Sequence, residues 1–180
     1  MISPAAERPT EGRKRNLTRI DSLDSLVGGH PDALGMLFAS APATDPAELG
    51  DAPRGRLLAL VPGAEVYMAI RPLMRALASD LLPWRGKVFD HGGNSGQNVV
   101  LGRKVFRFQV EVCPSVLDQR PALVLTYDAE AHGNPWILRV IRDELRTVGP
   151  GVAIGPAILM TRARAPRPLF WFGLEIARGA

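Results

Sequence analysis

Two pairs of adjacent polar residues could transfer protons. Asp90 and His91 stand at the start of a glycine-rich segment, and Tyr127 and Asp128 end a predicted strand. A carboxylate beside an imidazole or a phenol can act as an acid–base pair when it reaches the substrate. These four residues are therefore the candidate catalytic residues. The alternative is structural, because Asp and His are common in loops and Tyr127 also fits the apolar face of its strand.

A second group of residues could hold a ligand. Arg139 lies in a segment rich in arginine, and a guanidinium group can bind a carboxylate or a phosphate through two parallel hydrogen bonds. The alternative for Arg139 is an ion pair with Asp143, four residues later on a solvated helix face. Aromatic side chains could line a pocket or simply fill a core. Four of them are the candidate pocket residues: Trp84, Phe106, Phe108 and Trp171.

The sequence contains no pattern typical of a metal or cofactor site. Its three histidines, His30, His91 and His132, are far apart, whereas zinc ligands usually recur at short spacings. The single cysteine, Cys113, excludes an intramolecular disulfide and a CxxC motif, and we expect a buried structural thiol. The glycines around position 93 lack the spacing of a phosphate-binding loop. We therefore expect neither a metal nor a cofactor.

Strands are the main elements that would position these residues. Apolar and polar residues alternate strictly over 106–112, the period of a strand with one buried face. The segment 152–160 is nearly all apolar, with a glycine at Gly155, which predicts a strand covered on both faces. The other predicted strands are 57–61, 84–89, 97–101, 122–128 and 169–176.

Three helices are predicted between the strands. Pro31 precedes a short helix over 32–40, and apolar residues three and four apart predict a kinked helix over 64–82. Asn134 and Pro135 resemble a helix start, and Gly149 resembles a stop, so the third helix is expected over 134–148.

These elements predict a mainly β (α+β) domain. Consecutive strands with short links favour an antiparallel sheet, which closes into a barrel or packs as a sandwich. Glycines within the strands, such as Gly86, Gly155 and Gly173, suggest the bends of a small barrel. We therefore expect a small antiparallel barrel with two or three inserted helices over 20–180, preceded by a flexible basic tail over 1–19.

Four segments resemble a group of small bacterial lipocalin-like proteins that carry a Gly-x-Trp-x-Gly signature domain. The matching segments are 84–89, 134–135, 142–146 and 150–155, within a similarity that spans 45–176. At 50–55, where the first signature would fall, the sequence has no tryptophan between its glycines. The resemblance implies a lipocalin-like (calycin-type) barrel with an apolar interior, and it implies no particular activity.

Composition limits the partners. Only three of the 22 basic residues are lysine, and the arginines are scattered outside the tail, so no nucleic-acid surface is expected. No apolar run is long enough to span a bilayer, and the N-terminus lacks the apolar core of a secretion signal. We expect a cytoplasmic protein, with a homodimer as an open alternative to a monomer.

The expected function is binding of an apolar small molecule, such as a fatty acid, an isoprenoid or a polyketide-like compound, in the barrel cavity. One alternative is a cofactor-free cyclase, isomerase or hydratase of secondary metabolism that uses the same cavity for acid–base chemistry. A third hypothesis is an interaction module whose basic tail contacts nucleic acid or an acidic partner, tested by the salt dependence of binding.

Overall fold

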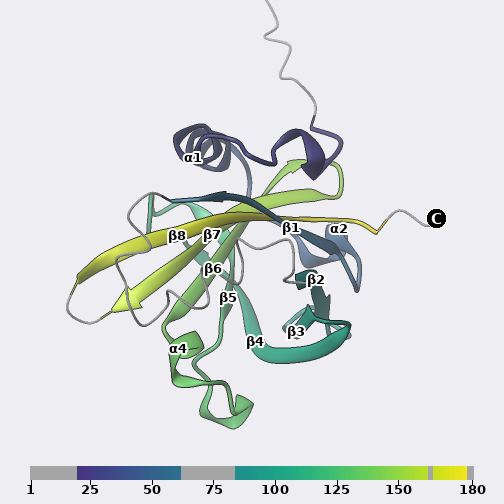
Figure 1. Ribbon diagram of the computed structural model, residues 1–180, viewed down its shortest axis with the longest axis vertical. Coiled ribbons are helices and arrows are strands. Elements are labelled where there is room, and N and C mark those ends of the chain that lie inside the picture. Colours follow the sequence, from purple (N-terminus) through teal and green to yellow (C-terminus); the bar gives the residue numbers. More distant parts are fainter. Residues whose placement is uncertain (1–19, 62–83, 162–163, 178–180) are drawn as a thin grey trace, which may run out of the picture.

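The computed structural model describes residues 20–61, 84–161 and 164–177. In them, eight strands form a closed antiparallel barrel (Figure 1). Each strand pairs with the next along the chain, and β8 returns to pair with β1. The strands are β1 (Arg54–Leu60), β2 (Trp84–Phe89), β3 (Ser95–Val100), β4 (Arg103–Pro114), β5 (Pro121–Thr126), β6 (Ile141–Gly149), β7 (Val152–Thr161) and β8 (Arg164–Glu175). The predicted small antiparallel barrel is confirmed.

In the described part of the chain, five short helical segments accompany the barrel. Three are α-helices and two are 3₁₀ turns: η1 (Leu23–Ser25), α1 (Pro31–Ser40), α2 (Pro46–Leu49), η3 (Glu130–His132) and α4 (Trp136–Arg139). None of the helices in the described part of the chain is long and apolar enough to cross a membrane. The predicted helix over 64–82 and the tail over 1–19 lie outside the described residues.

The antiparallel order gives the barrel two distinct ends. At one end, which we call the α4 end, β5 leads through η3 and α4 into β6. At the opposite end, the α2 end, lie the β2–β3, β4–β5 and β6–β7 turns, and the buried side chain of Leu49 from α2 packs into the interior cluster. Any residue inside the barrel can therefore be placed nearer one end or the other.

Apolar side chains pack on both faces of the sheet. Ala157 of β7 belongs to the cluster inside the barrel, together with Phe108 and Phe172. Ile154 of the same strand belongs to the cluster on the outer face of the barrel. The outer face of β1, β5, β7 and β8 is covered by η1 and α1 (Figure 1). This double coverage confirms the prediction for β7, whose apolar residues are buried on both sides.

Helix α1 begins where the sequence indicates. The imidazole of His30 accepts a hydrogen bond from the Asp32 amide at 3.3 Å, and Pro31 occupies the first turn. Its buried Phe38 meets Trp171 edge-on, with ring centroids 5.8 Å apart. Trp171 therefore belongs to the packing outside the barrel.

The predicted helix over 134–148 is wrong over most of its length. Only Trp136–Arg139 is helical, and Ile141–Gly149 is the strand β6, which pairs with β5 and β7. Apolar positions spaced by three and four also fit a strand that is covered on both faces. The charged side chain of Asp143, expected on a solvated helix face, is instead buried with a polar partner, and so is that of Arg146.

Strand β4 departs from strict alternation at two places. Phe106 has a φ of +55°, and the register with β3 shifts beside it, as at a β-bulge. Phe108 is fully buried as predicted, but Val112, near the α2 end, is 55% exposed. The bulge sets the direction of Phe106, which lines the cavity described next.

Candidate functional site

A partly open cavity of about 130 Å³ lies inside the barrel, in the half nearer the α4 end. Four polar residues and eight apolar residues form its wall; eleven of them come from seven helices and strands, and Tyr127 directly follows β5. The polar residues are Lys87, Asn98, Tyr127 and Asp143; the apolar residues are Leu57, Trp84, Val100, Phe106, Leu138, Ile141, Phe170 and Phe172. The cavity is therefore an apolar chamber with one polar cluster.

Lys87 is the centre of the polar cluster. Its side chain is 2% exposed, and its Nζ donates hydrogen bonds to Asn98 Oδ1 at 2.9 Å, Tyr127 Oη at 2.8 Å and Asp143 Oδ2 at 2.9 Å. Three acceptors match the three N–H groups of an ammonium ion. A buried charge is tolerated only when it is paired and hydrogen-bonded in this way.

The partners of Lys87 also bind one another. The Tyr127 hydroxyl donates to Asp143 Oδ2 at 2.7 Å and accepts from Asn98 Nδ2 at 3.2 Å. Trp84 Nε1 donates to Asn98 Oδ1 at 3.1 Å. Strands β2, β3, β5 and β6 are thereby joined across the barrel interior. The network holds each polar group of the cavity in one orientation.

Aromatic rings surround the ammonium group of Lys87. Its Nζ lies 5.0 Å from the ring centre of Phe108, 5.3 Å from Phe172, 5.5 Å from Tyr127 and 5.8 Å from Trp84. The negative faces of such rings attract a cation and partly replace its lost water.

Burial changes the acid–base properties of two groups. It lowers the pKa of Lys87, although the charge of Asp143 and its hydrogen bond work in the opposite direction. Burial also raises the pKa of Tyr127 well above its ordinary value, and the nearby Asp143 charge adds to this effect. Tyr127 is therefore a neutral hydrogen-bond donor at physiological pH.

The structure brings together three of the nine predicted site residues. Tyr127, Trp84 and Phe106 all line the cavity. Phe108 packs in the core next to the cavity, with its ring facing the Lys87 ammonium group. These residues come from β2, β4 and the end of β5, so the barrel gathers them from distant parts of the chain.

The other predicted residues lie away from the cavity. Asp128 is exposed although it follows Tyr127, and Trp171 packs outside the barrel. Asp90 and His91 are exposed in the β2–β3 turn at the α2 end, where Asp90 accepts a hydrogen bond from Ser95 Oγ at 2.7 Å.

Arg139 also serves a local purpose. Its Nε donates to the carbonyl oxygen of Asn134 at 2.9 Å, which ties α4 to the preceding loop. The Asn134 side chain in turn donates to the carbonyl oxygens of Arg107 at 2.7 Å and Tyr127 at 3.0 Å. The predicted pairing of Arg139 with Asp143 does not form, since Asp143 pairs with Lys87 inside the barrel.

A second hollow lies beside Asp90. It measures about 700 Å³ and runs between α2, the β2–β3 turn and the ends of β4 and β5. Asp45, Asp51 and Glu111 line it together with Asp90. Among the described residues, no three His, Cys, Asp or Glu side chains are arranged to hold a metal ion.

Sequence reasoning missed Lys87, Asn98 and Asp143. A signal existed for Lys87, which is one of only three lysines and stands inside a predicted strand next to Val88 and Phe89. A signal for Asp143 appears only when β6 is read as a strand, because Asp143 then shares its face with Ile141 and Leu145.

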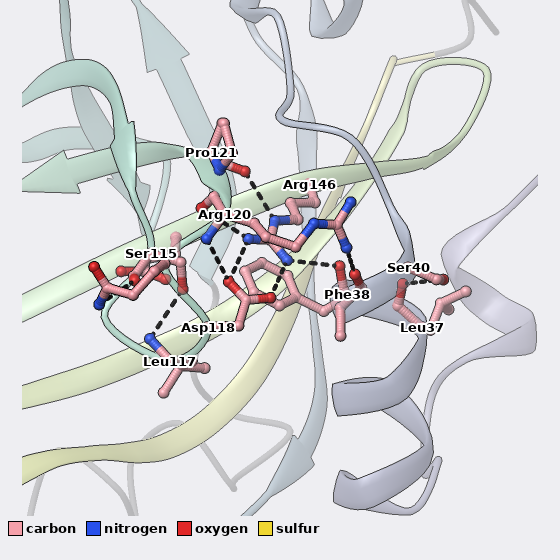
Figure 2. Close-up of polar contacts among 12 residues, drawn as sticks. Leu37, Phe38, Ser40, Ser115, Leu117, Asp118, Arg120, Pro121 and Arg146 are labelled. Atoms are coloured by element: carbon pink, nitrogen blue, oxygen red, sulfur yellow. Dashed lines mark hydrogen bonds and ion pairs between the residues drawn. The ribbon is translucent and has the colours of Figure 1, made fainter.

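A fully buried arginine, Arg146, anchors α1 and the β4–β5 loop to the outer face of β6. Figure 2 shows its guanidinium among acceptors from both segments. It donates to Asp118 Oδ1 and Oδ2, each at 2.7 Å, and to the carbonyl oxygens of Phe38 at 3.2 Å, Pro121 at 3.0 Å and Arg120 at 2.9 Å. Hydrogen bonding from Arg146 lowers the pKa of Asp118. This cluster is separate from the cavity and structural in character.

Comparison with known proteins extends these observations at the level of the fold. No family model matches the chain, and no curated protein matches it. The chain is similar in structure to a protein from Thermomonospora curvata, with a TM-score of 0.51 and 11% sequence identity. The match covers 87% of this chain and 93% of that chain. The closed eight-stranded antiparallel barrel and this neighbour fit a lipocalin-like barrel at the level of the fold.

Proposed function

We propose that the protein binds a compact apolar small molecule inside the barrel, in the half nearer the α4 end. The supporting observation is the cavity of about 130 Å³ with apolar walls around one polar cluster. Protein interiors are otherwise closely packed, and unfilled volume costs stability. An apolar cavity of ~150 Å³ is known to bind benzene. Apolar walls with a few placed polar groups are typical of small-molecule sites.

The size of the cavity narrows the expected ligands. A single aromatic ring or one short branched isoprenoid unit matches its volume. A complete long fatty acyl chain exceeds that volume. The cavity between Leu57 and Phe172 would therefore hold a whole ligand of one ring, or the ring-sized part of a larger one.

The test uses toluene as a probe in ligand-observed NMR and in thermal unfolding. Val100→Phe places a larger side chain in the cavity wall, and Val27→Phe makes the same change on the exposed surface. Toluene is expected to bind the wild-type protein and the Val27→Phe variant, and to raise their Tm, because it binds only the folded state. Equal binding to Val100→Phe would place the site elsewhere, and no binding to any form would refute the proposal.

A second candidate function is proton-transfer catalysis without a cofactor, by a cyclase, an isomerase or a hydratase. The observation that favours it is the pair formed by Tyr127, a neutral donor, and Asp143, a carboxylate at the cavity wall. Asp143 takes the role that the sequence suggested for Asp128, because Asp128 is exposed. The Lys87 ammonium group lies 2.9 Å from Asp143 Oδ2 and would orient this carboxylate.

Native mass spectrometry of the protein purified from its own host would identify a co-purified molecule. If that molecule is a substrate or product, Tyr127→Phe should lower turnover by about 10²- to 10⁴-fold. Asp128→Asn is the control and should leave turnover unchanged. A turnover that survives Tyr127→Phe would leave binding as the function.

A further inference from the structure

The polar cluster of the cavity has no hydrogen-bond donor to spare. Lys87 uses its three N–H groups on Asn98, Tyr127 and Asp143, and the Tyr127 hydroxyl donates to Asp143. Asn98 Nδ2 donates to Tyr127 Oη at 3.2 Å and to the Phe106 carbonyl oxygen at 3.3 Å. The indole N–H of Trp84 is used by Asn98. A ligand that needs a donor from this wall would have to break the network.

The same cluster has an acceptor to spare. Both hydrogen bonds to Asp143 end on Oδ2. Within 20–61, 84–161 and 164–177, no donor reaches Asp143 Oδ1, although the residue is only 5% exposed and lines the cavity. Among the described residues this oxygen therefore has no donor, and a hydrogen-bond donor on a ligand in the cavity could reach it.

The charges of Asp143 and Lys87 indicate which kind of ligand group fits beside Asp143 Oδ1. A ligand carboxylate would meet the negative charge of Asp143, while the balancing ammonium of Lys87 is already committed. A ligand cation would lie close to that ammonium, which stands 2.9 Å from Asp143 Oδ2. A neutral hydroxyl group avoids both repulsions and can donate one charge-assisted hydrogen bond.

We infer that the ligand is a compact apolar molecule with a neutral hydroxyl group, such as a monocyclic phenol or a cyclic alcohol, and that this hydroxyl donates to Asp143 Oδ1. The inference rests on the proposed function, and it selects alcohols and phenols over fatty acids and amines. Rings such as Phe106 and Phe172 would hold the apolar part, and Asp143 would fix its orientation.

Three probes of similar size test the inference on the wild-type protein: phenol, toluene and benzoate. Phenol and toluene differ by a hydroxyl in place of a methyl group, so their ratio of dissociation constants isolates the hydrogen bond. Isothermal titration at neutral pH should show phenol binding about tenfold or more tighter than toluene, and benzoate weaker than both. Toluene binding as tightly as phenol would overturn the inference while the proposed function stands. Failure of all three probes would overturn both.

A variant pair assigns the effect to one residue. Asp143→Asn replaces the charged acceptor by a neutral amide, and Asp128→Asn makes the same change on the exposed neighbour of Tyr127. The advantage of phenol over toluene should fall several-fold in Asp143→Asn, since hydrogen bonds to charged groups are roughly twice as strong as neutral ones. It should persist in Asp128→Asn. An unchanged advantage in a folded Asp143→Asn protein contradicts the assignment, and the wild-type probe series decides if that variant does not fold.

Discussion

At the scale of single residues, two buried cations show how the chain accommodates charge. Lys87 inside the barrel has three acceptors, and Arg146 outside it has five, which is the full donor capacity of each group. The guanidinium of Arg146 also stacks on Phe38, 4.3 Å from the ring centre. Both residues therefore stabilise the fold only together with their partners, because a buried polar group without a partner is costly.

The first prediction concerns Arg146. Arg146→Met leaves the Asp118 carboxylate with only the Arg120 amide as donor and removes the Arg146 donor from several carbonyl oxygens, so the free energy of unfolding should fall by about 1–3 kcal/mol. Urea denaturation of the variant and of an Arg103→Met control measures this. Arg103 is exposed in the β3–β4 hairpin, and its loss should cost about 0.5 kcal/mol or less. A small effect at Arg146 would show that the cluster contributes little to stability.

The second prediction concerns alkaline pH. The pKa of Tyr127 is raised well above 10.0 in the folded protein, so between pH 10 and that higher pKa only the unfolded state loses the proton. Unfolding is then favoured, and this contribution to stability is complete below pH 10 and lost as pH rises. Tyr127→Phe removes it.

Denaturation curves measured from pH 7 to 11 test this. Above pH 10, the free energy of unfolding should fall less steeply in Tyr127→Phe than in the wild type, by up to about 1.4 kcal/mol per pH unit. Between pH 7 and 9 the two slopes should agree, which serves as the internal control. Parallel curves over the whole range would mean that Tyr127 titrates normally.

At the scale of elements, β6 shows where periodicity misleads. In a strand with one solvated face, apolar and polar residues alternate in the sequence, as they do in β4 around Phe108. Both faces of β6 are buried, one in the barrel interior and the other against α1. Its charged residues are then buried as pairs, so no polar face remains in the sequence to mark the strand. Ile141–Gly149 therefore carries spacings of three and four that also suit a helix.

The third prediction contrasts two glycines. Gly35 lies within α1, where an added Cβ would stand 3.7 Å from the Trp171 ring, an ordinary contact. Gly35→Ala should stabilise the protein by about 0.5–1 kcal/mol, since glycine costs entropy in a helix. Gly155 of β7 lies where a Cβ would meet the Glu144 carbonyl oxygen, so Gly155→Ala should destabilise it by about 1–3 kcal/mol. Thermal unfolding compares the two, and shifts of equal sign would contradict this packing.

At the scale of the whole molecule, the two strand pairs that β1 makes differ in length among the described residues. Strand β1 pairs with β8 at six positions, from Arg54 opposite Glu175 to Leu60 opposite Phe170. It pairs with β2 at Arg54 opposite Gly86, and two backbone hydrogen bonds continue this pairing toward the α2 end, from Lys87 to Pro53 and from Phe89 to Asp51. The hydrogen bonds between β1 and β2 are therefore expected to break before those between β1 and β8.

The fourth prediction follows from this difference. The amides of Lys87 and Phe89, which extend the β1–β2 pairing, should exchange with solvent about tenfold or more faster than the amide of Ile154 in β7, which has paired strands on both sides. Native-state hydrogen exchange followed by NMR measures both groups. Identical rates would show that the barrel opens only by global unfolding.

Most of the strands of the barrel, and some of the residues inside it, could be predicted from the sequence. Alternation around Phe108, the unbroken apolar run of β7 and the short links between strands predict an antiparallel barrel, because these are local patterns. Trp84 and Phe106 could also be predicted, since aromatic residues on strand faces often line an interior, and Tyr127 is indicated as a polar residue at a strand end. No local pattern could show which of them line a cavity and which, like Trp171, pack outside.

The polar cluster could not be predicted from local patterns in the sequence. Lys87 and Asp143 are 56 positions apart, and they meet because closure of the barrel brings β2 and β6 to face each other across the interior. Each would be unstable in the core alone, since a buried charge requires a partner. Their compatibility is thus a property of the closed barrel, whereas the strand patterns are properties of the chain.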